Sequence, residues 1–397
     1  MKKYIFIAIC FLAQSFILFG QEHIDFQKIN FAQAKEKAAQ DNKLIFLDGY
    51  TTWCAPCKWM ESNVFNKKEV ADYYNSKFIN IKVDCEAGEG IDIAKAYQIK
   101  SFPTYLFLDD KGTLIYRTQS RMEADLFLKE AEKANNSEYQ IPNIVAEYAA
   151  GNRNSFFLLR YIQVMNNVDQ SKATMGMKAL DSVANDSFLK TPAGWETIKM
   201  MAKNSQDKYG RFFNANKNYF KSIAAPADFL QKEIQLLRYD MYGYIREKQL
   251  DKFNAGLTFF ENQNDPQLNI DAAMFKAEWA GTNGTAKEFT TLTNKLRKGI
   301  LKNEDEKLSF IARRYANSKL NVGNAQNIQQ CYVLAKQAVK LNPNSYSNQG
   351  TFAEICITLK KKKEAVKAAL AARAIAEDET SKIQKIADAL VERAKAL

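Results

Sequence analysis

The hydrophobic pattern changes twice along the chain and divides it into three stretches. Residues 4–19 are almost wholly apolar. From there to about residue 135, short apolar runs of strand length alternate with polar and helical stretches. Beyond about residue 143, apolar side chains recur every three or four positions, which is typical of helices, and short breaks between helices are predicted at residues 191–192, 225–226, 265–266, 281–284 and 342–343. The pattern therefore predicts an α/β domain followed by an all-α domain.

The N-terminal apolar stretch has the three parts of a secretory signal peptide. Met1-Lys2-Lys3 is a basic start, residues 4–19 form the apolar centre, and Gly20 is a small-residue exit. We expect a signal peptide over residues 1–20 and an exported mature chain in an oxidising compartment. A retained membrane anchor is the alternative, but the apolar run is shorter than the roughly 20 residues that span a bilayer.

Three apolar runs between residues 21 and 135 predict strands of one sheet. They cover residues 43–49, 77–84 and 101–109, and the last contains Pro103 near its start. A proline cannot donate a ladder hydrogen bond, so it belongs at the start or edge of a strand. Residues 90–97 show helical periodicity between the second and third runs. The order predicts a βαβ arrangement with helices beside a sheet.

Two cysteines two residues apart, Cys54 and Cys57, directly follow the first predicted strand. A metal site, a structural disulfide and a redox pair are the alternatives. A zinc site is disfavoured because His23 is the only histidine and the other mature cysteines, which are Cys85, Cys331 and Cys356, are scattered. A purely structural bridge is disfavoured because closing so short a loop gains little chain entropy.

A redox pair fits the local pattern best. The helix is expected to begin at the cysteines, with Pro56 in its first turn, where the missing N–H costs nothing. Cys54 then lies at a helix N-terminus, where free N–H groups and the helix dipole stabilise a thiolate. Cys57, one turn further on, is placed to attack a mixed disulfide and release the partner.

Residues 25–135 resemble a thioredoxin-fold domain, with a W-C-x-x-C-K helix between two strands and a later strand that begins at a proline. The resemblance implies a central mixed sheet flanked by helices, with Cys54 as the nucleophile and Cys57 as the resolving cysteine. It also implies that Asp48 is a buried acid that manages the proton of the resolving thiol, and that Pro103 is a cis-proline. The substrate-binding residues implied are Trp53, Phe102, Pro103 and Thr104.

The segment W-C-A-P-C-K-W-M-E at residues 53–61 is similar to the C-terminal periplasmic domain of the DsbD thiol:disulfide interchange proteins. This resemblance implies a catalytic role for Glu61, a periplasmic location, protein disulfides as substrates and reduction fed by a membrane-bound thiol donor, with no cofactor or metal. One departure concerns charge. The lysine that neighbours the buried acid in thioredoxins is expected to fall on Asn80, with Lys82 two residues on, which leaves the charge balance around Asp48 open.

Residues 136–142 are a plausible linker to the helical domain, residues 143–397. Near its end, small residues recur 34 positions apart, at Cys331, Ala335 and Ala338 and again at Ala365, Ala369 and Ala372. This spacing resembles tetratricopeptide repeats, which implies a surface that holds a protein partner. Cys331 and Cys356 fall at packing positions, and a disulfide between them is the alternative.

Function divides into two hypotheses. The first is an exported thiol–disulfide oxidoreductase whose helical half recruits a protein. The second is a non-catalytic scaffold in which the thioredoxin-like half is a docking module. Basic residues outnumber acidic ones beyond residue 136, but their one cluster, residues 360–363, has no stacking motif nearby. We therefore expect no nucleic-acid partner.

Overall fold

The computed structural model describes residues 23–316, 327–378 and 381–397. The expected signal peptide, residues 1–20, lies outside the described residues. The chain divides into two compact units, residues 1–194 and 195–397, and each is described by itself. None of the helices within the described residues is long and apolar enough to cross a membrane.

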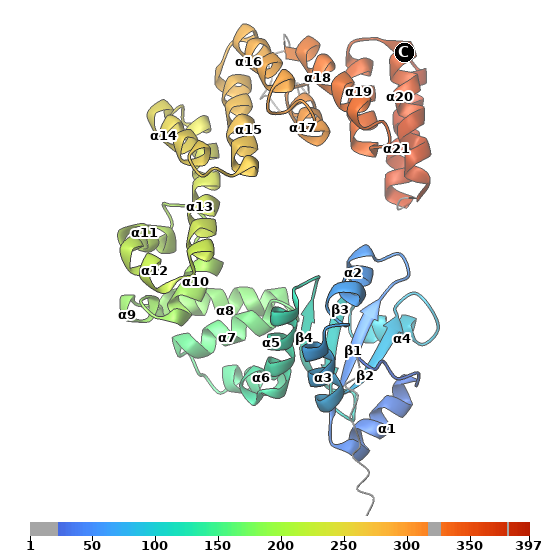
Figure 1. Cartoon of the computed structure of the whole chain (residues 1–397), viewed down its shortest axis with the longest axis vertical. Helices are drawn as coiled ribbons and strands as arrows, with labels where there is room; N and C mark the ends of the chain where they lie inside the picture. The colour runs from blue at the N-terminus through green and yellow to red at the C-terminus, as the bar shows by residue number, and fades with distance from the viewer. Residues whose placement is uncertain (1–22, 317–326, 379–380) are drawn as a thin grey trace, which may run out of the picture. The chain divides into compact units, whose positions relative to one another are not determined.

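The first unit is built on a four-stranded mixed sheet in the order β2-β1-β3-β4 (Figure 1). Its strands are β1 (Leu44–Tyr50), β2 (Phe78–Asp84), β3 (Thr104–Leu108) and β4 (Leu114–Gln119). β1 pairs with β2 in parallel and with β3 antiparallel, and β3 pairs with β4 antiparallel. The three predicted strands are present, and the predicted mixed sheet flanked by helices is confirmed.

Because side chains alternate along β1, each face of the sheet is covered by a different hydrophobic cluster. Ile45 and Leu47 lie in an aliphatic cluster with residues of β2, β3, α1 (Phe31–Asp41) and α4 (Gly90–Ala96). The intervening Phe46 lies in an aromatic cluster with residues that include Tyr74 of α3 (Lys68–Lys77) and Phe127 of α5 (Ala124–Asn135). Because side chains alternate between the faces of a strand, the next even position, Asp48, shares the side of the aromatic cluster.

Helices continue the first unit beyond the sheet. They are α6 (Ile141–Ala149), α7 (Ser155–Met165), α8 (Gln170–Val183) and α9 (Asp186–Leu189). The stretch expected to be a linker, residues 136–142, includes the short 3₁₀ helix η1 (Ser137–Tyr139) and the start of α6. η1 contacts α5, and α6 contacts β4. The compact unit thus extends to residue 194, whereas the boundaries at 135 and 143 stay a prediction.

The second unit is helical throughout its described residues. Its helices are α10 (Pro192–Met201, which begins at the end of the first unit), α11 (Lys208–Ala215), α12 (Lys217–Ile223), α13 (Pro226–Arg246), α14 (Leu250–Glu261), α15 (Pro266–Asn283), α16 (Ala286–Lys298), α17 (Asp305–Ala316), α18 (Ile328–Leu341), α19 (Tyr346–Thr358), α20 (Lys362–Ile375) and α21 (Ser381–Lys395). Three of them begin at a proline, as the predicted breaks at Pro192, Pro226 and Pro266 require.

The C-terminal helices pack on their sequence neighbours and on the next helix but one. α17 contacts both α18 and α19, and α19 contacts both α20 and α21. Small buried residues line these contacts, among them Ala335 on α18 and Ala369 on α20, which are 34 positions apart. Cys331 and Cys356 are buried free thiols, so the alternative of a disulfide between them is not formed here.

Candidate active site

The cysteine pair lies where β1 gives way to α2 (Ala55–Asn63). Cys54 is the N-cap of α2, and its Sγ accepts a hydrogen bond from the backbone N–H of Cys57 at 3.1 Å. Pro56 lies in the first turn, as expected. Cys54 and Cys57 form a disulfide with their Cα atoms 5.3 Å apart, and they are 2% and 3% exposed. The two cysteines therefore form a bridge at a helix N-terminus, and the redox role of the pair stays a prediction.

This placement determines what the pair can do once it is reduced. The first N–H groups of a helix have no partner within the helix, and they carry the positive end of its dipole. A sulfur that already accepts one of these N–H groups is stabilised as the thiolate, which is the attacking form in disulfide exchange. Cys54 has this position, whereas Cys57 lies inside the first turn.

Asp48, on β1, is the buried acid of the site. It is 1% exposed, and its Oδ1 has no hydrogen-bond partner among the described residues. Burial raises the pKa of Asp48 to about 7, against a smaller opposing effect from the positive charge of Lys82. A carboxylate that titrates near neutral pH can both accept and return a proton, which is the property required of a general base in exchange.

Lys82 settles the charge balance around Asp48, which the sequence left open. The position of the family's lysine was expected to fall on Asn80, but the parallel register sets Lys82 opposite Asp48 and Asn80 opposite Phe46. Asn80 Nδ2 instead donates a hydrogen bond to Asn75 at 3.0 Å. Burial lowers the pKa of Lys82, and the charge of Asp48 partly offsets this effect. The acid thus keeps a basic neighbour.

Glu61 joins the same group of charges from α2. Its carboxylate forms an ion pair with Lys82, whose Nζ also lies 4.3 Å from the centre of the Tyr50 ring. The side chain of Glu61 is 47% exposed, so Lys82 connects a solvent-accessible acid with the buried Asp48. The sequence-based assignment of Glu61 to the site is consistent with this position, and its catalytic role stays a prediction.

The predicted substrate-binding residues lie in two segments, one directly before α2 and one at the start of β3. The peptide bond between Phe102 and Pro103 is cis. Trp53 is 65% exposed, and its ring meets the Phe102 ring edge-on, with the ring centroids 5.9 Å apart. Thr104 is buried, and its hydroxyl donates a hydrogen bond to the Ser101 carbonyl at 2.7 Å. Of the four, Trp53 therefore offers the most surface to a partner, and Thr104 the least.

Sequence reasoning missed Glu86, whose carboxylate accepts a hydrogen bond from Trp53 Nε1 at 2.8 Å. Nothing in the spacing of the two residues signals this contact, because it depends on how the loop after β2 folds back.

Cys85, next to Glu86, is buried, and burial raises the pKa of its thiol to about 11. Cys85 is therefore protonated at neutral pH, and we assign it no step. Within the described residues, no cluster of histidine, cysteine and acidic side chains could hold a metal ion.

Comparison with known proteins connects this geometry to a family. Residues 15–113 match a family model named Thioredox_DsbH and described as a protein of unknown function, DUF255. The chain is similar to Thioredoxin-1 of Drosophila melanogaster, with 45% identity over 74 residues that cover 19% of this chain and 64% of that protein. It is also similar to Thioredoxin-1 of Drosophila yakuba, with 42% identity over 80 residues that cover 20% and 70%.

Two bacterial proteins extend the comparison. The thiol:disulfide interchange protein DsbD of Actinobacillus pleuropneumoniae is 30% identical over 114 residues, which cover 27% of this chain and 19% of DsbD. The chain is also similar to a solved structure of a putative disulphide-isomerase from Bacteroides thetaiotaomicron, with 38% identity and a TM-score of 0.28. The match covers 29% of this chain and 95% of that protein. Taken with the sheet and the cysteine pair, the similarity to thioredoxins shows that this chain belongs to the thioredoxin family through its N-terminal part.

Proposed function

We propose that this protein is an exported thiol–disulfide oxidoreductase that reduces or exchanges disulfides of periplasmic proteins. One observation carries the proposal: the Cys54–Cys57 disulfide caps α2 at the end of β1, the strand that also holds the buried Asp48. A structural bridge has no need of a neighbouring acid that titrates near neutral pH, whereas an exchanging pair does.

Reduction of a substrate proceeds in two exchange steps. In the first, the Cys54 thiolate attacks one sulfur of the substrate disulfide. A mixed disulfide forms, and the other substrate sulfur leaves as a thiolate and takes up a proton. In the second, the Cys57 thiol gives its proton to a base, and its sulfur attacks Cys54. The substrate leaves with both sulfurs reduced, and the chain retains the oxidised pair.

Asp48 is assigned the proton of Cys57. Its pKa of about 7 means that a substantial fraction is ionised at neutral pH and can accept the proton. Lys82 keeps that pKa from rising further, and Glu61 holds Lys82 from the solvent side. In the second step, Asp48 thus accepts the proton, and Glu61 positions Lys82.

The oxidised pair exposes little sulfur, so most of the contact with a substrate falls on its surroundings. The Trp53 ring, held by Glu86 and Phe102, offers an exposed apolar face beside Cys54. The segment from Phe102 to Thr104 supplies backbone for a bound polypeptide, as the family resemblance implies.

The two accessory parts of the proposal are export and recruitment. The basic and apolar sequence of residues 1–20 supports export, and the similarity to DsbD supports the periplasm and a membrane-bound dithiol that re-reduces Cys54 and Cys57. The small-residue period of 34 supports tetratricopeptide-like repeats that hold a protein partner.

The test is reduction of insulin by the purified chain with dithiothreitol as the electron donor. We expect Cys54→Ser to fall to the uncatalysed rate. Cys57→Ser that is first reduced and then freed of dithiothreitol before insulin is added should accumulate a mixed disulfide that mass spectrometry detects. Cys85→Ala should retain turnover and serves as the control. If Cys54→Ser still accelerated the reaction, the proposed activity would be wrong. A scaffold that uses the thioredoxin-like part only for docking would instead keep its partners after both Cys54 and Cys57 became alanine.

A further inference from the structure

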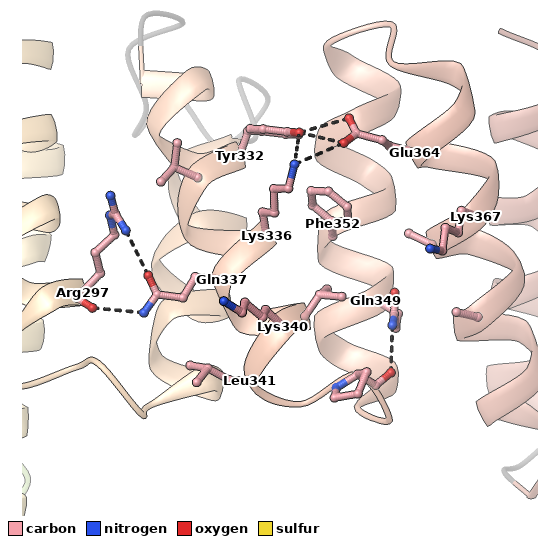
Figure 2. A pocket seen from close by; sticks show the side chains of 15 residues that line it. Arg297, Tyr332, Lys336, Gln337, Lys340, Leu341, Gln349, Phe352, Glu364 and Lys367 are labelled. Carbon is pink, nitrogen blue, oxygen red and sulfur yellow. Dashed lines mark hydrogen bonds and ion pairs between the residues drawn. The ribbon is translucent and has the colours of Figure 1, made fainter.

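A groove lies between α18 and α20 of the second unit, with α19 beneath it (Figure 2). Its volume is about 930 Å³, which is at the upper end of the range for ligand-binding clefts. It is lined from α18 by Tyr332, Lys336 and Lys340, from α19 by Gln349 and Phe352, and from α20 by Glu364 and Lys367. Neither the cysteine pair nor any residue of the first unit lines it.

The floor of the groove is apolar. Phe352 lies on α19 between the two flanking helices (Figure 2). Ala368 and Ala371 line the groove from α20. Leu341, at the end of α18, is 40% exposed at one rim. Alanine on α20 leaves space that a larger side chain would fill. The groove therefore has room for aliphatic side chains brought in from outside.

The walls of the groove are basic, and Glu364, the one acidic residue among the described residues that line it, already pairs with Lys336. Glu364 accepts a hydrogen bond from the Tyr332 hydroxyl at 2.8 Å and lies 3.5 Å from Lys336 Nζ. The Tyr332 hydrogen bond is the main cause that lowers the pKa of Glu364, so this carboxylate stays ionised and balances Lys336. What remains is a surplus of positive charge from the other basic side chains.

Three cations carry this surplus. Lys340 and Lys367 are exposed and form no ion pair with any described residue, and they lie on opposite sides of Phe352 (Figure 2). Arg297, from α16, contacts only neutral groups around the groove, including the side-chain oxygen of Gln337 at 3.2 Å. The groove thus combines an apolar floor with three cations that have no anionic partner within the described residues.

We propose that this groove binds an acidic segment of a partner protein, with aliphatic side chains on the floor and carboxylates at Arg297, Lys340 and Lys367. The inference rests on the proposed recruitment of a protein by the helical half and names the chemistry of that partner. Charge complementarity selects the occupant: carboxylates restore neutrality at the walls, and leucine or isoleucine fits a floor made of phenylalanine and alanine.

Two other polyanions fit the groove less well. Nucleic acids are held by exposed aromatic faces on which bases stack, and Phe352 is 8% exposed. An anionic membrane surface is nearly flat, so it could reach the rim lysines but not the floor between α18 and α20. Each alternative becomes an outcome of the test below.

The test measures fluorescence anisotropy of a fluorescein-labelled peptide of four Asp-Glu-Leu repeats with the full mature chain. We expect saturable binding that weakens with added salt and that falls when serine replaces leucine or when asparagine and glutamine replace the acids. The double variant Lys340→Glu/Lys367→Glu should weaken binding roughly tenfold or more, because two attractive pairs become repulsive.

The matched control is Lys362→Glu/Lys363→Glu, which makes the same charge change on exposed residues of the same region that do not line the groove. It should bind the peptide as the native chain does. All four lysines are exposed, so neither variant removes core packing, and circular dichroism checks that both fold. Insulin reduction should be unchanged in both, which separates failure of this inference from failure of the proposed activity.

Three results would overturn the inference. The first is equal binding by the groove variant and the control variant. The second is equal binding of the acidic and the uncharged peptide. The third is no peptide binding together with lysine-dependent binding of phosphatidylglycerol vesicles or of single-stranded DNA, which would assign the groove to another polyanion.

Discussion

Replacing Asp48 with asparagine should change how stability depends on pH. Asp48 is 1% exposed and its pKa is raised to about 7, so the folded chain holds this proton more tightly than the unfolded chain does. Where the folded state binds more protons, stability falls as pH rises. Relative to Asp48→Asn, which cannot ionise at this position, the native chain should therefore lose stability from about pH 4 to pH 7.

The size of the effect follows from the two ends of the titration. The pKa moves from the ordinary 3.8 to about 7. At about 1.4 kcal/mol for each pKa unit, the ionised Asp48 costs about 4 kcal/mol above pH 8 and about 2 kcal/mol near pH 5.5. Below about pH 3 the acid is mostly protonated in both states, so the variant and the native chain should then differ only by a constant offset.

Hydrogen–deuterium exchange of peptides from β1 and β3 measures this locally in the full chain. At each pH, the ratio of exchange rates in the native chain and in Asp48→Asn gives the free-energy difference, because intrinsic exchange rates cancel. Asp110→Asn, the same change at an exposed acid, is the control and should show no pH trend. A difference between Asp48→Asn and the native chain that stayed constant from about pH 5 to pH 8 would refute the reasoning about burial.

Two further predictions concern Lys82 and a packed glycine. Lys82→Met removes the charge that holds down the pKa of Asp48. In stopped-flow kinetics, the rate at which the mixed disulfide is resolved should therefore reach half its maximum at a higher pH than in the native chain. An unchanged midpoint pH would contradict the assignment of Asp48 as the base. Gly281→Ala sets a Cβ against the Tyr315 ring and should destabilise the second unit by about 1–3 kcal/mol in urea unfolding. Gly243→Ala, where a Cβ meets nothing within 4 Å, should be neutral or slightly stabilising, and equal effects of the two would count against the packing explanation.

The elements around the cysteines were predictable because local signals and tertiary structure agree. Apolar runs of strand length became β1, β2 and β3, and the helix begins at the cysteines with proline in its first turn. The breaks at Pro192, Pro226 and Pro266 became helix starts for the same reason, since a proline at the first helical position loses no hydrogen bond. Such features depend on a few neighbouring residues.

The neighbour of Asp48 could not be predicted in this way. Asn80 and Lys82 are two residues apart on one strand, so both face the same side and periodicity cannot choose between them. The choice is made by the parallel register of β1 and β2, which is a tertiary property. Gly281 failed for a related reason: it was expected to end a helix, but α15 continues to Asn283, and the glycine instead makes room for a ring from α17.

The burial of the cysteine pair bears on why a redox domain would be joined to a helical half. Cys54 and Cys57 expose almost no surface, and the aromatic patch beside them rests mainly on one exposed ring, that of Trp53. A substrate contact that rested mainly on this ring would favour turnover of many substrates but supply little affinity for any one of them. A second site on the same chain raises the local concentration of a tethered substrate without altering the chemistry at the sulfurs. Selectivity would then depend on the basic groove around Phe352 and reactivity on the pair, and each could change in evolution without loss of the other.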